Sequence, residues 1–163
     1  PIYDLEPARV ISADISPYFR VLRIRLEAQS DAIRPEMPVV SSEGLVGRIE
    51  QVNGRYCDVM LTIDPRSKVD ILTNLNRSRG ILSGLGDEKT YEAKLSYLLR
   101  RDEVEEGEIV VTSGRAGTFP KELPVGRITS IDAQDFGLYQ RVTVTPLVDF
   151  SRLEEVYIIT GVR

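Results

Sequence analysis

The chain contains the same sequence pattern twice, and this internal repeat constrains its fold more than any other feature. Residues 39–49 (VVSSEGLVGRI) are matched by residues 110–128, which begin with VVTSG and end with LPVGRI. Landmarks on either side match in the same order, and the separation of matched residues grows from 70 (Arg9 to Arg79) to 83 near the end of the repeat. The second copy therefore carries insertions. A repeat of this length with several short strand-like runs per copy predicts two similar β-domains in tandem.

Apolar residues alternate with polar ones in short runs, which is typical of strands with one buried face. Six runs fall in each copy. They cover residues 9–14, 19–27, 38–41, 45–53, 58–63, 68–73, 80–83, 91–98, 109–113, 126–132, 141–146 and 156–160. Turn-forming residues separate the runs and leave room for helices only as single turns at 65–68, 102–106 and 150–155. We therefore predict an all-β chain.

The predicted architecture is two tandem, small, six-stranded β-barrel-like domains, because closing a sheet removes its exposed edges. We place the first domain at residues 8–78 and the second at residues 79–163. The sequence leaves open whether the second barrel closes on its own strands or takes one from the first.

Glycines mark the places where the repeat needs backbone freedom. We assign five of them to structural turns: Gly44, Gly47, Gly114, Gly117 and Gly126. We also expect Gly47 and Gly126 to occupy equivalent strand positions in the two copies, each followed by an arginine that alternation directs outward.

Composition narrows the classes of partner. The 163 residues carry a formal net charge of −4, which disfavours a nucleic-acid partner because binding phosphate needs an excess of positive charge. No apolar run approaches the roughly 20 residues needed to span a bilayer. Because the chain starts at Pro1 rather than Met, we expect a processed protein or a fragment whose membrane anchor, if it has one, lies upstream.

The chain lacks the residues that most hydrolases and metal sites use. It has no histidine, and its single cysteine, Cys57, excludes an internal disulfide and suits a small buried position. Ser113 and Lys121 could be considered as a serine–lysine pair, but nothing in their spacing holds them together. Residues 114–117 (GRAG) lack the lysine and hydroxyl residue of a phosphate-binding loop. We expect no enzymatic activity, no metal and no cofactor.

The repeated segments resemble one known family. Residues 44–49, 110–114, 117–120 (GTFP) and 123–128 match, in order and spacing, the most recognisable stretch of MreC, the rod shape-determining protein family, and the resemblance extends over nearly the whole chain. One departure is Glu122, where the family usually has a glycine. A glutamate at this position suggests that it does not need a positive φ.

The resemblance implies a location and a role. Members of the family have a membrane-spanning helix and a coiled coil, followed by two β-barrel-like domains outside the membrane, and this chain looks like those two domains alone. The family implies a non-enzymatic scaffold for lateral cell-wall elongation that maintains rod shape and self-associates. The implied partners are the elongation penicillin-binding protein, MreD and RodZ. Membrane attachment would then depend on the anchor that this chain lacks.

Aromatic residues near turns are the best candidates for partner contacts, because aromatics dominate binding hot spots. The candidates are Tyr18, Phe19, Phe119, Phe136 and Tyr139. Each could instead close the end of its own barrel. Two alternative functions remain open from the sequence alone: a hydrolase built on a β-barrel, and an OB-like module that binds a ligand or an oligonucleotide.

Overall fold

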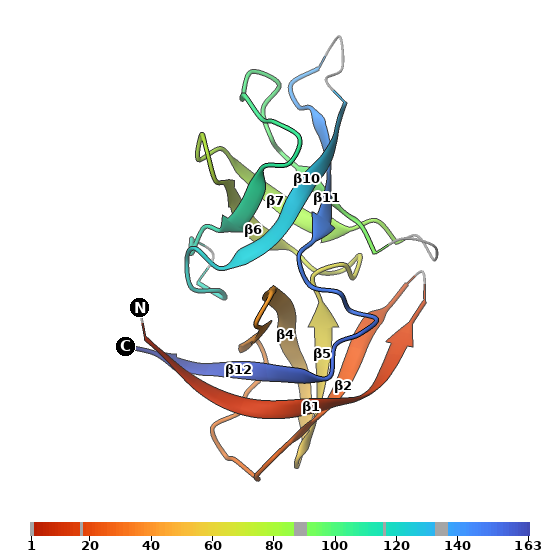
Figure 1. Cartoon of the computed structure of the whole chain (residues 1–163), viewed down its shortest axis with the longest axis vertical. Coiled ribbons are helices and arrows are strands. Elements are labelled where there is room, and N and C mark those ends of the chain that lie inside the picture. The colour runs from red at the N-terminus through yellow and green to blue at the C-terminus, as the bar shows by residue number, and fades with distance from the viewer. Residues whose placement is uncertain (1, 17, 87–90, 116, 133–136) are drawn as a thin grey trace.

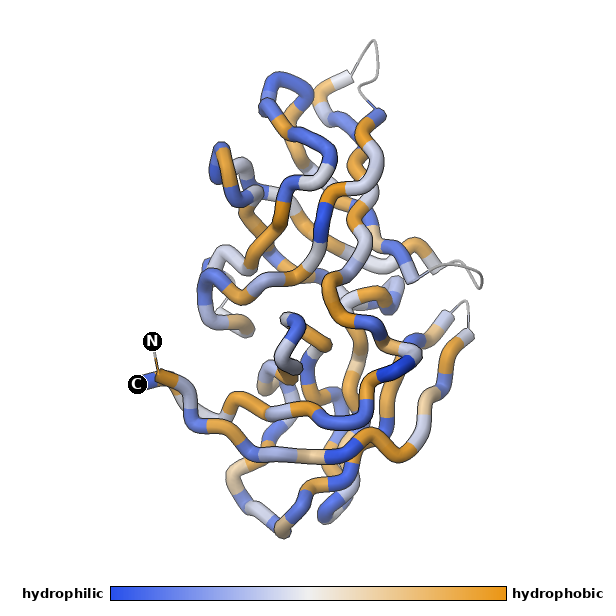
Figure 2. Tube along the Cα trace, viewed as in Figure 1, coloured by the Kyte–Doolittle hydropathy of each residue, from blue (hydrophilic) through white to orange (hydrophobic). Residues whose placement is uncertain are grey.

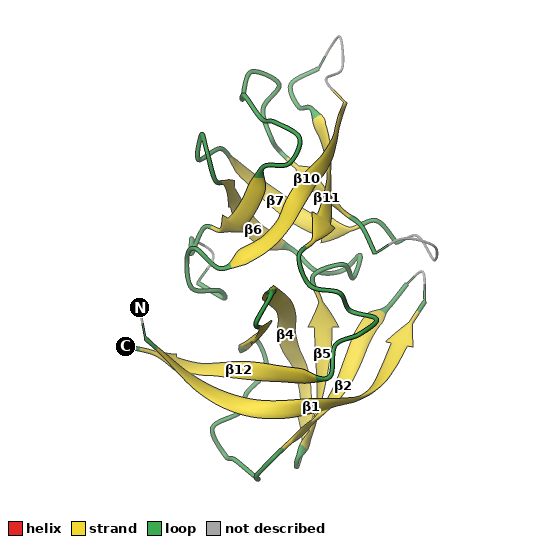
Figure 3. Ribbon diagram, in the orientation of Figure 1, coloured by secondary structure: helices red, strands yellow, loops and turns green. Residues whose placement is uncertain are grey.

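The computed structural model describes residues 2–16, 18–86, 91–115, 117–132 and 137–163 (Figure 3). The strands are β1 (Tyr3–Ile15), β2 (Arg20–Leu26), β3 (Pro38–Ser41), β4 (Gly44–Asn53), β5 (Tyr56–Leu61), β6 (Val69–Thr73), β7 (Arg79–Gly84), β8 (Ala93–Ser96), β9 (Ile109–Thr112), β10 (Pro124–Asp132), β11 (Arg141–Pro146) and β12 (Glu155–Val162). Within the described ranges there is no helix, and hence none long and apolar enough to cross a membrane. The three segments with possible helical turns contain turns and bends instead.

The strands form two closed barrels, one above the other in Figure 1. The order around the first barrel is β1-β12-β3-β4-β5-β2, and the order around the second is β10-β11-β8-β7-β6-β9. All pairings between named strands are antiparallel. The prediction of an all-β chain with two six-stranded barrels is therefore confirmed.

Each barrel takes its sixth strand from the other half of the chain. β6 follows β5 in the sequence but pairs with β7 and β9 in the second barrel. β12 follows β11 but pairs with β1 and β3 in the first barrel. The folded barrels thus do not follow the expected division into residues 8–78 and 79–163. Alternation along β6 and β12 shows that each strand has a buried face, but it does not say which barrel buries that face.

The two barrels repeat the same strand register. Gly47 in β4 and Gly126 in β10 each lie two residues before a bulge, which follows Ile49 in one barrel and Ile128 in the other. Both glycines lie inside strands, so their assignment to turns is corrected. The reason for glycine is a close approach of backbones, because a Cβ at Gly47 would lie 2.0 Å from the carbonyl oxygen of Met60.

Hydrophobic and hydrophilic residues alternate along the strands (Figure 2), and this alternation separates a buried core from an exposed face. In β2, Leu22, Ile24 and Leu26 are buried, while Arg23 and Arg25 are exposed. Each fully buried aliphatic side chain of this kind contributes about 1.5–3 kcal/mol to folding. Cys57, on the neighbouring β5, is buried in the same core, as expected for a small apolar residue.

The barrels also pack directly against each other. The core of the second barrel includes Leu45 from β4 and Ile159 from β12, which are both strands of the first barrel. Gly44 allows this contact, since a Cβ at that residue would lie 2.6 Å from the carbonyl oxygen of Pro124 in β10. The two units therefore share apolar surface, as small domains that bury little of their own surface need to do.

The described part of the loop between β9 and β10 contains three residues with positive φ. Gly114 has a φ of 77°, Gly117 has a φ of 80°, and both lie in the turn predicted for them. Glu122 has a φ of 68°, so the inference that this position does not need a positive φ is wrong. The exposed Glu122 carboxylate pairs with Arg77, and the surrounding hydrogen bonds, including one from the Glu122 amide to the Thr112 carbonyl at 2.8 Å, hold the left-handed conformation.

Candidate interaction surfaces

The predicted contact aromatics do not form one patch. Tyr18 and Phe19 are 75% and 47% exposed at the tip of the β1–β2 hairpin of the first barrel, and Tyr139 is 44% exposed on the second barrel. Phe119 is buried in the core of the second barrel, so its assignment as a contact residue is corrected. Phe136 lies outside the described residues. The roles of Tyr18, Phe19 and Tyr139 in partner binding remain predictions.

Tyr139 lies against a second exposed aromatic that the sequence did not single out. Tyr97 is 62% exposed, and its ring meets that of Tyr139 edge-to-face, with 5.6 Å between centroids. Its φ of 67° is unusual for a large side chain, and strain of this kind is concentrated at functional sites. The alternation in the sequence predicts a single strand over residues 91–98, which gives no reason to select Tyr97 as a contact residue. In the structure, β8 ends at Ser96, and Tyr97 lies in the bend that follows.

A network of hydrogen bonds holds the two tyrosines in place. The Gln140 side chain is buried and donates to the carbonyls of Leu99 (2.8 Å) and Asp102 (2.9 Å). The Asp102 carboxylate accepts from the amide of Leu99 at 3.1 Å. Leu99 also forms a β-bridge with Tyr139. The turn that follows Tyr97 is therefore fixed to the segment that carries Tyr139, and the aromatic pair is pre-organised.

Two grooves flank the tyrosine pair, and both are lined by Tyr97 and Tyr139. One has a volume of about 550 Å³ and runs over β8 and β11, and the other has a volume of about 640 Å³ and extends toward β7. Leu138 and Leu85 add exposed apolar surface nearby, at 62% and 45%. We call the surface formed by Leu85, Tyr97 and Tyr139 the aromatic face. Large side chains held rigidly beside grooves are the usual anchors of protein interfaces.

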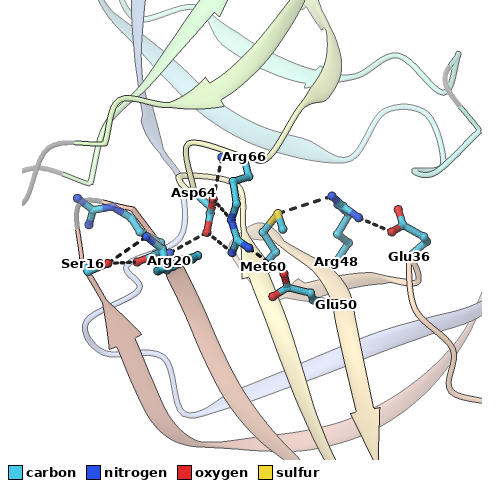
Figure 4. A network of polar contacts seen from close by, with 9 residues as sticks. Ser16, Arg20, Glu36, Arg48, Glu50, Met60, Asp64 and Arg66 are labelled. Atoms are coloured by element: carbon cyan, nitrogen blue, oxygen red, sulfur yellow. Dashed lines mark hydrogen bonds and ion pairs between the residues drawn. The ribbon is translucent and has the colours of Figure 1, made fainter.

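The hairpin tip of the first barrel is built differently. The Ser16 Oγ accepts from the amide of Phe19 at 3.0 Å, and the Phe19 ring lies beneath the guanidinium of Arg66, with 4.7 Å to the ring centroid. Arg66 in turn donates to Asp64 and to Glu50 (Figure 4). Phe19 is therefore tied into the barrel's own polar network: it is about as exposed as Tyr139, but its ring already contacts the guanidinium of Arg66.

Asp64 is the centre of this polar network. Its side chain is fully buried and accepts from the Arg20 amide at 2.7 Å and from the Arg66 amide and guanidinium at 2.7–3.0 Å. Burial alone would raise the pKa of Asp64, but these hydrogen bonds outweigh burial and hold the pKa below its ordinary value. Asp64 is thus a structural carboxylate that stays ionised.

Arg20 adds a contact between the barrels. Its side chain is 1% exposed, and its guanidinium lies 5.4 Å from the ring centroid of Tyr91 in the second barrel. Cation–π attraction of this kind is stronger where water is excluded.

Ser113, the nucleophile considered for catalysis, has structural partners. The Ser113 hydroxyl donates to the Asp70 carboxylate at 2.7 Å and accepts from the amide of Arg115 at 3.1 Å. Asp70 also pairs with Arg79, and the hydrogen bond from Arg79 is the main reason that the pKa of Asp70 is low. Within the part of the chain that the structure describes, no three His, Cys, Asp or Glu residues are arranged to hold a metal ion.

Comparison with known proteins gives consistent matches. The family described as "Rod shape-determining protein MreC, barrel core" matches residues 10–160. The cell shape-determining protein MreC of Caulobacter vibrioides is 33% identical over 126 residues, covering 77% of this chain and 35% of the relative. The MreC of Bacillus subtilis is 26% identical over 170 residues, covering 97% and 58%. The chain thus spans between about a third and just over half of the length of these relatives.

Solved structures have the same fold. MreC from Pseudomonas aeruginosa superposes with a TM-score of 0.87 at 22% identity, covering 96% of this chain and 99% of that one. The major periplasmic domain of the cell shape-determining filament MreC gives a TM-score of 0.79 at 20% identity, covering 98% of each chain. The structure of a complex between a penicillin-binding protein (PBP2) and MreC from Helicobacter pylori gives a TM-score of 0.71 at 16% identity, covering 98% and 100%. Since the family match covers residues 10–160 and both barrels, the chain belongs to the MreC family of rod shape-determining proteins.

Proposed function

We propose that this chain is the partner-binding part of a non-enzymatic scaffold that organises peptidoglycan synthases during lateral cell-wall elongation and so maintains rod shape. The family assignment supports a role in cell shape, and the periplasmic origin of a structural relative supports a position outside the cytoplasmic membrane. We propose that an anchor upstream of this chain attaches it to the membrane. MreD, RodZ and further copies of the chain are proposed as additional partners.

The aromatic face is the observation that carries this proposal. Closed barrels leave few open strand edges for partners, so binding depends on the barrel faces and loops. The aromatic face combines exposed tyrosines, a fixed turn and two grooves. The complex of the Helicobacter pylori relative with PBP2 supports the elongation penicillin-binding protein as the first partner to test.

The test is a titration of the chain against the extracytoplasmic part of the elongation penicillin-binding protein. We expect Tyr97→Ala or Tyr139→Ala to weaken binding about tenfold or more, as for central aromatic anchors. Tyr56→Ala is the matched control, because Tyr56 is 46% exposed but lies on β5 of the first barrel. Tyr18→Ala tests the hairpin tip separately.

Two results would contradict the proposal. One is the absence of binding by the unmodified chain. The other is hydrolysis of peptidoglycan fragments that disappears in a Ser113→Ala variant, since that would make the chain an enzyme.

A further inference from the structure

The groove over β8 and β11 is lined by positively charged residues and by no described carboxylate. Its described lining includes the cations Lys94 and Arg141, the apolar residues Leu85, Tyr97 and Tyr139, and no aspartate or glutamate. This is notable in a chain with a net charge of −4. We call it the cationic groove.

The corresponding cations of the first barrel are neutralised. The groove of about 530 Å³ beside the β1–β2 hairpin contains Arg23 and Arg66, and both form ion pairs with carboxylates of the same groove, namely Asp58 at 3.0 Å and Glu50 at 3.0 Å. Asp14 also lines it. That groove therefore has no excess of positive charge, and its two arginines are already paired with carboxylates.

Lys94 and Arg141, in contrast, form no ion pair with any carboxylate that the structure describes. Both are exposed, Lys94 on β8 and Arg141 on the neighbouring β11. Lys94 pairs with Thr143, which is two residues from Arg141 on the same strand. The two positive charges thus stand on the same outer face of the barrel, beside the tyrosine pair.

We propose that the cationic groove binds an acidic segment of a protein partner, with an apolar side chain of that segment against Tyr97 and Tyr139 and its carboxylates beside Lys94 and Arg141. Charge complementarity selects the acidic residues. The tyrosines and leucine favour a peptide over a polymer that carries only phosphate and sugar, because such a polymer has no side chain to bury there. This inference rests on the proposed function for the class of partner and adds the chemistry that the partner must have.

The test uses the whole chain and three fluorescent decapeptides. Each has one central phenylalanine, flanked on both sides by glutamates, by glutamines or by lysines, and binding is measured by anisotropy. We expect the glutamate peptide to bind about tenfold more tightly than the glutamine peptide, with the lysine peptide weakest. Raising the salt from about 0.05 to about 0.5 M should remove most of the preference, since these charges are exposed.

The test variant combines Lys94→Gln and Arg141→Gln. The matched control is Arg25→Gln, which removes an exposed cation from β2 of the first barrel. We expect the double variant to bind the glutamate and glutamine peptides equally and Arg25→Gln to keep the preference. Equal binding of both peptides by the unmodified chain would overturn the inference, and so would a preference that survives the double variant. Poly(glycerol phosphate) that competes as well as the glutamate peptide would overturn it in favour of a phosphate polymer.

The outcome separates this inference from the proposed function. If the penicillin-binding protein binds but no acidic preference exists, only the inference about the groove fails. If the acidic peptide binds at the groove but the penicillin-binding protein does not bind, the proposed partner is wrong and the chemistry of the groove stands.

Discussion

The two connectors that carry the chain from one barrel to the other have the same local structure but different surroundings. Residues 62–68 join β5 to β6, and residues 147–154 join β11 to β12. Both begin with an amide donating to β4 or β10 at 3.1 Å, and both contain an aspartate whose carboxylate accepts from the amide two residues later. The first of these aspartates, Asp64, is fully buried, whereas Asp149 has a side chain that is 49% exposed.

The repeated sequence produces the same turn in both connectors, but the packing around each turn determines how much that turn contributes to stability. The buried connector packs against β7, where Gly84 donates to the Asp64 carbonyl at 3.2 Å. A Cβ at Gly84 would lie 1.7 Å from the carbonyl oxygen of Ile63. Ala13 of β1 occupies the position equivalent to Gly84 by strand register and is exposed, so it keeps its Cβ.

The largest expected effect comes from filling the space at Gly84. Gly84→Val should lower the free energy of unfolding by about 3 kcal/mol or more, because the connector must move to admit the side chain. Urea unfolding followed by circular dichroism measures the change. Ala13→Val is the matched control and should alter stability by less than about 0.5 kcal/mol, as exposed substitutions do. Similar losses for the two variants would show that the connectors do not differ.

A smaller effect is expected from removing the buried carboxylate. Asp64→Ala should cost about 2 kcal/mol, because the Arg20 amide and the guanidinium of Arg66 lose their acceptor. Asp149→Ala removes the same type of turn in solvent, where water replaces the lost acceptor, and should change the urea midpoint much less. An Asp149→Ala variant as unstable as Asp64→Ala would refute the contrast between the two sites.

The pH dependence of stability should depend on the same carboxylate. The folded-state pKa of Asp64 is below its ordinary value, so ionised Asp64 adds stability above that value, and the contribution is lost as the pH falls through the folded pKa. Stability should therefore decrease below about pH 4, near the ordinary pKa of an aspartate. Asp64→Asn should flatten this decrease, whereas Asp149→Asn should leave most of it. Urea midpoints measured between neutral and acidic pH give the comparison.

The smallest effect concerns the β9–β10 loop, which is longer than its counterpart between β3 and β4. Glu122→Gly should stabilise the chain by up to about 1 kcal/mol, because glycine adopts the φ of 68° without strain. The lost pair with Arg77 is exposed and offsets little of this gain. Glu106→Gly, at an exposed position without positive φ, should destabilise slightly. A lower melting temperature for Glu122→Gly would show that the ion pair outweighs the strain.

Much of the fold could be predicted from the sequence because strand alternation is a local signal. The strands at 38–41 and 141–146 match their predicted ends, and the repeated VGRI segments have the same register in both barrels. The exchange of β6 and β12 could not be predicted, since it depends on which distant strand each one meets. The burial of Asp64 has the same origin, because Asp64 and Asp149 are alike in local sequence.

The interaction surface was harder to predict than the fold. Tyr139 was identified from its position near turns, but Tyr97 was hidden within a run that read as one strand, and its positive φ has no sequence signal for a tyrosine. Phe119 also lies near turns, yet it packs into the core. Exposure depends on how a loop folds back over its barrel, and residue type alone does not determine this.

The exchange of strands also sets the order in which the two barrels receive their last strand during synthesis. All six strands of the second barrel are present once β11 has emerged, because β6 precedes it in the chain. The first barrel lacks the strand between β1 and β3 until residues 155–162 are made. The second barrel can therefore close before the first, and a nascent chain that stops before Glu155 has all six strands of the second barrel but lacks β12 of the first.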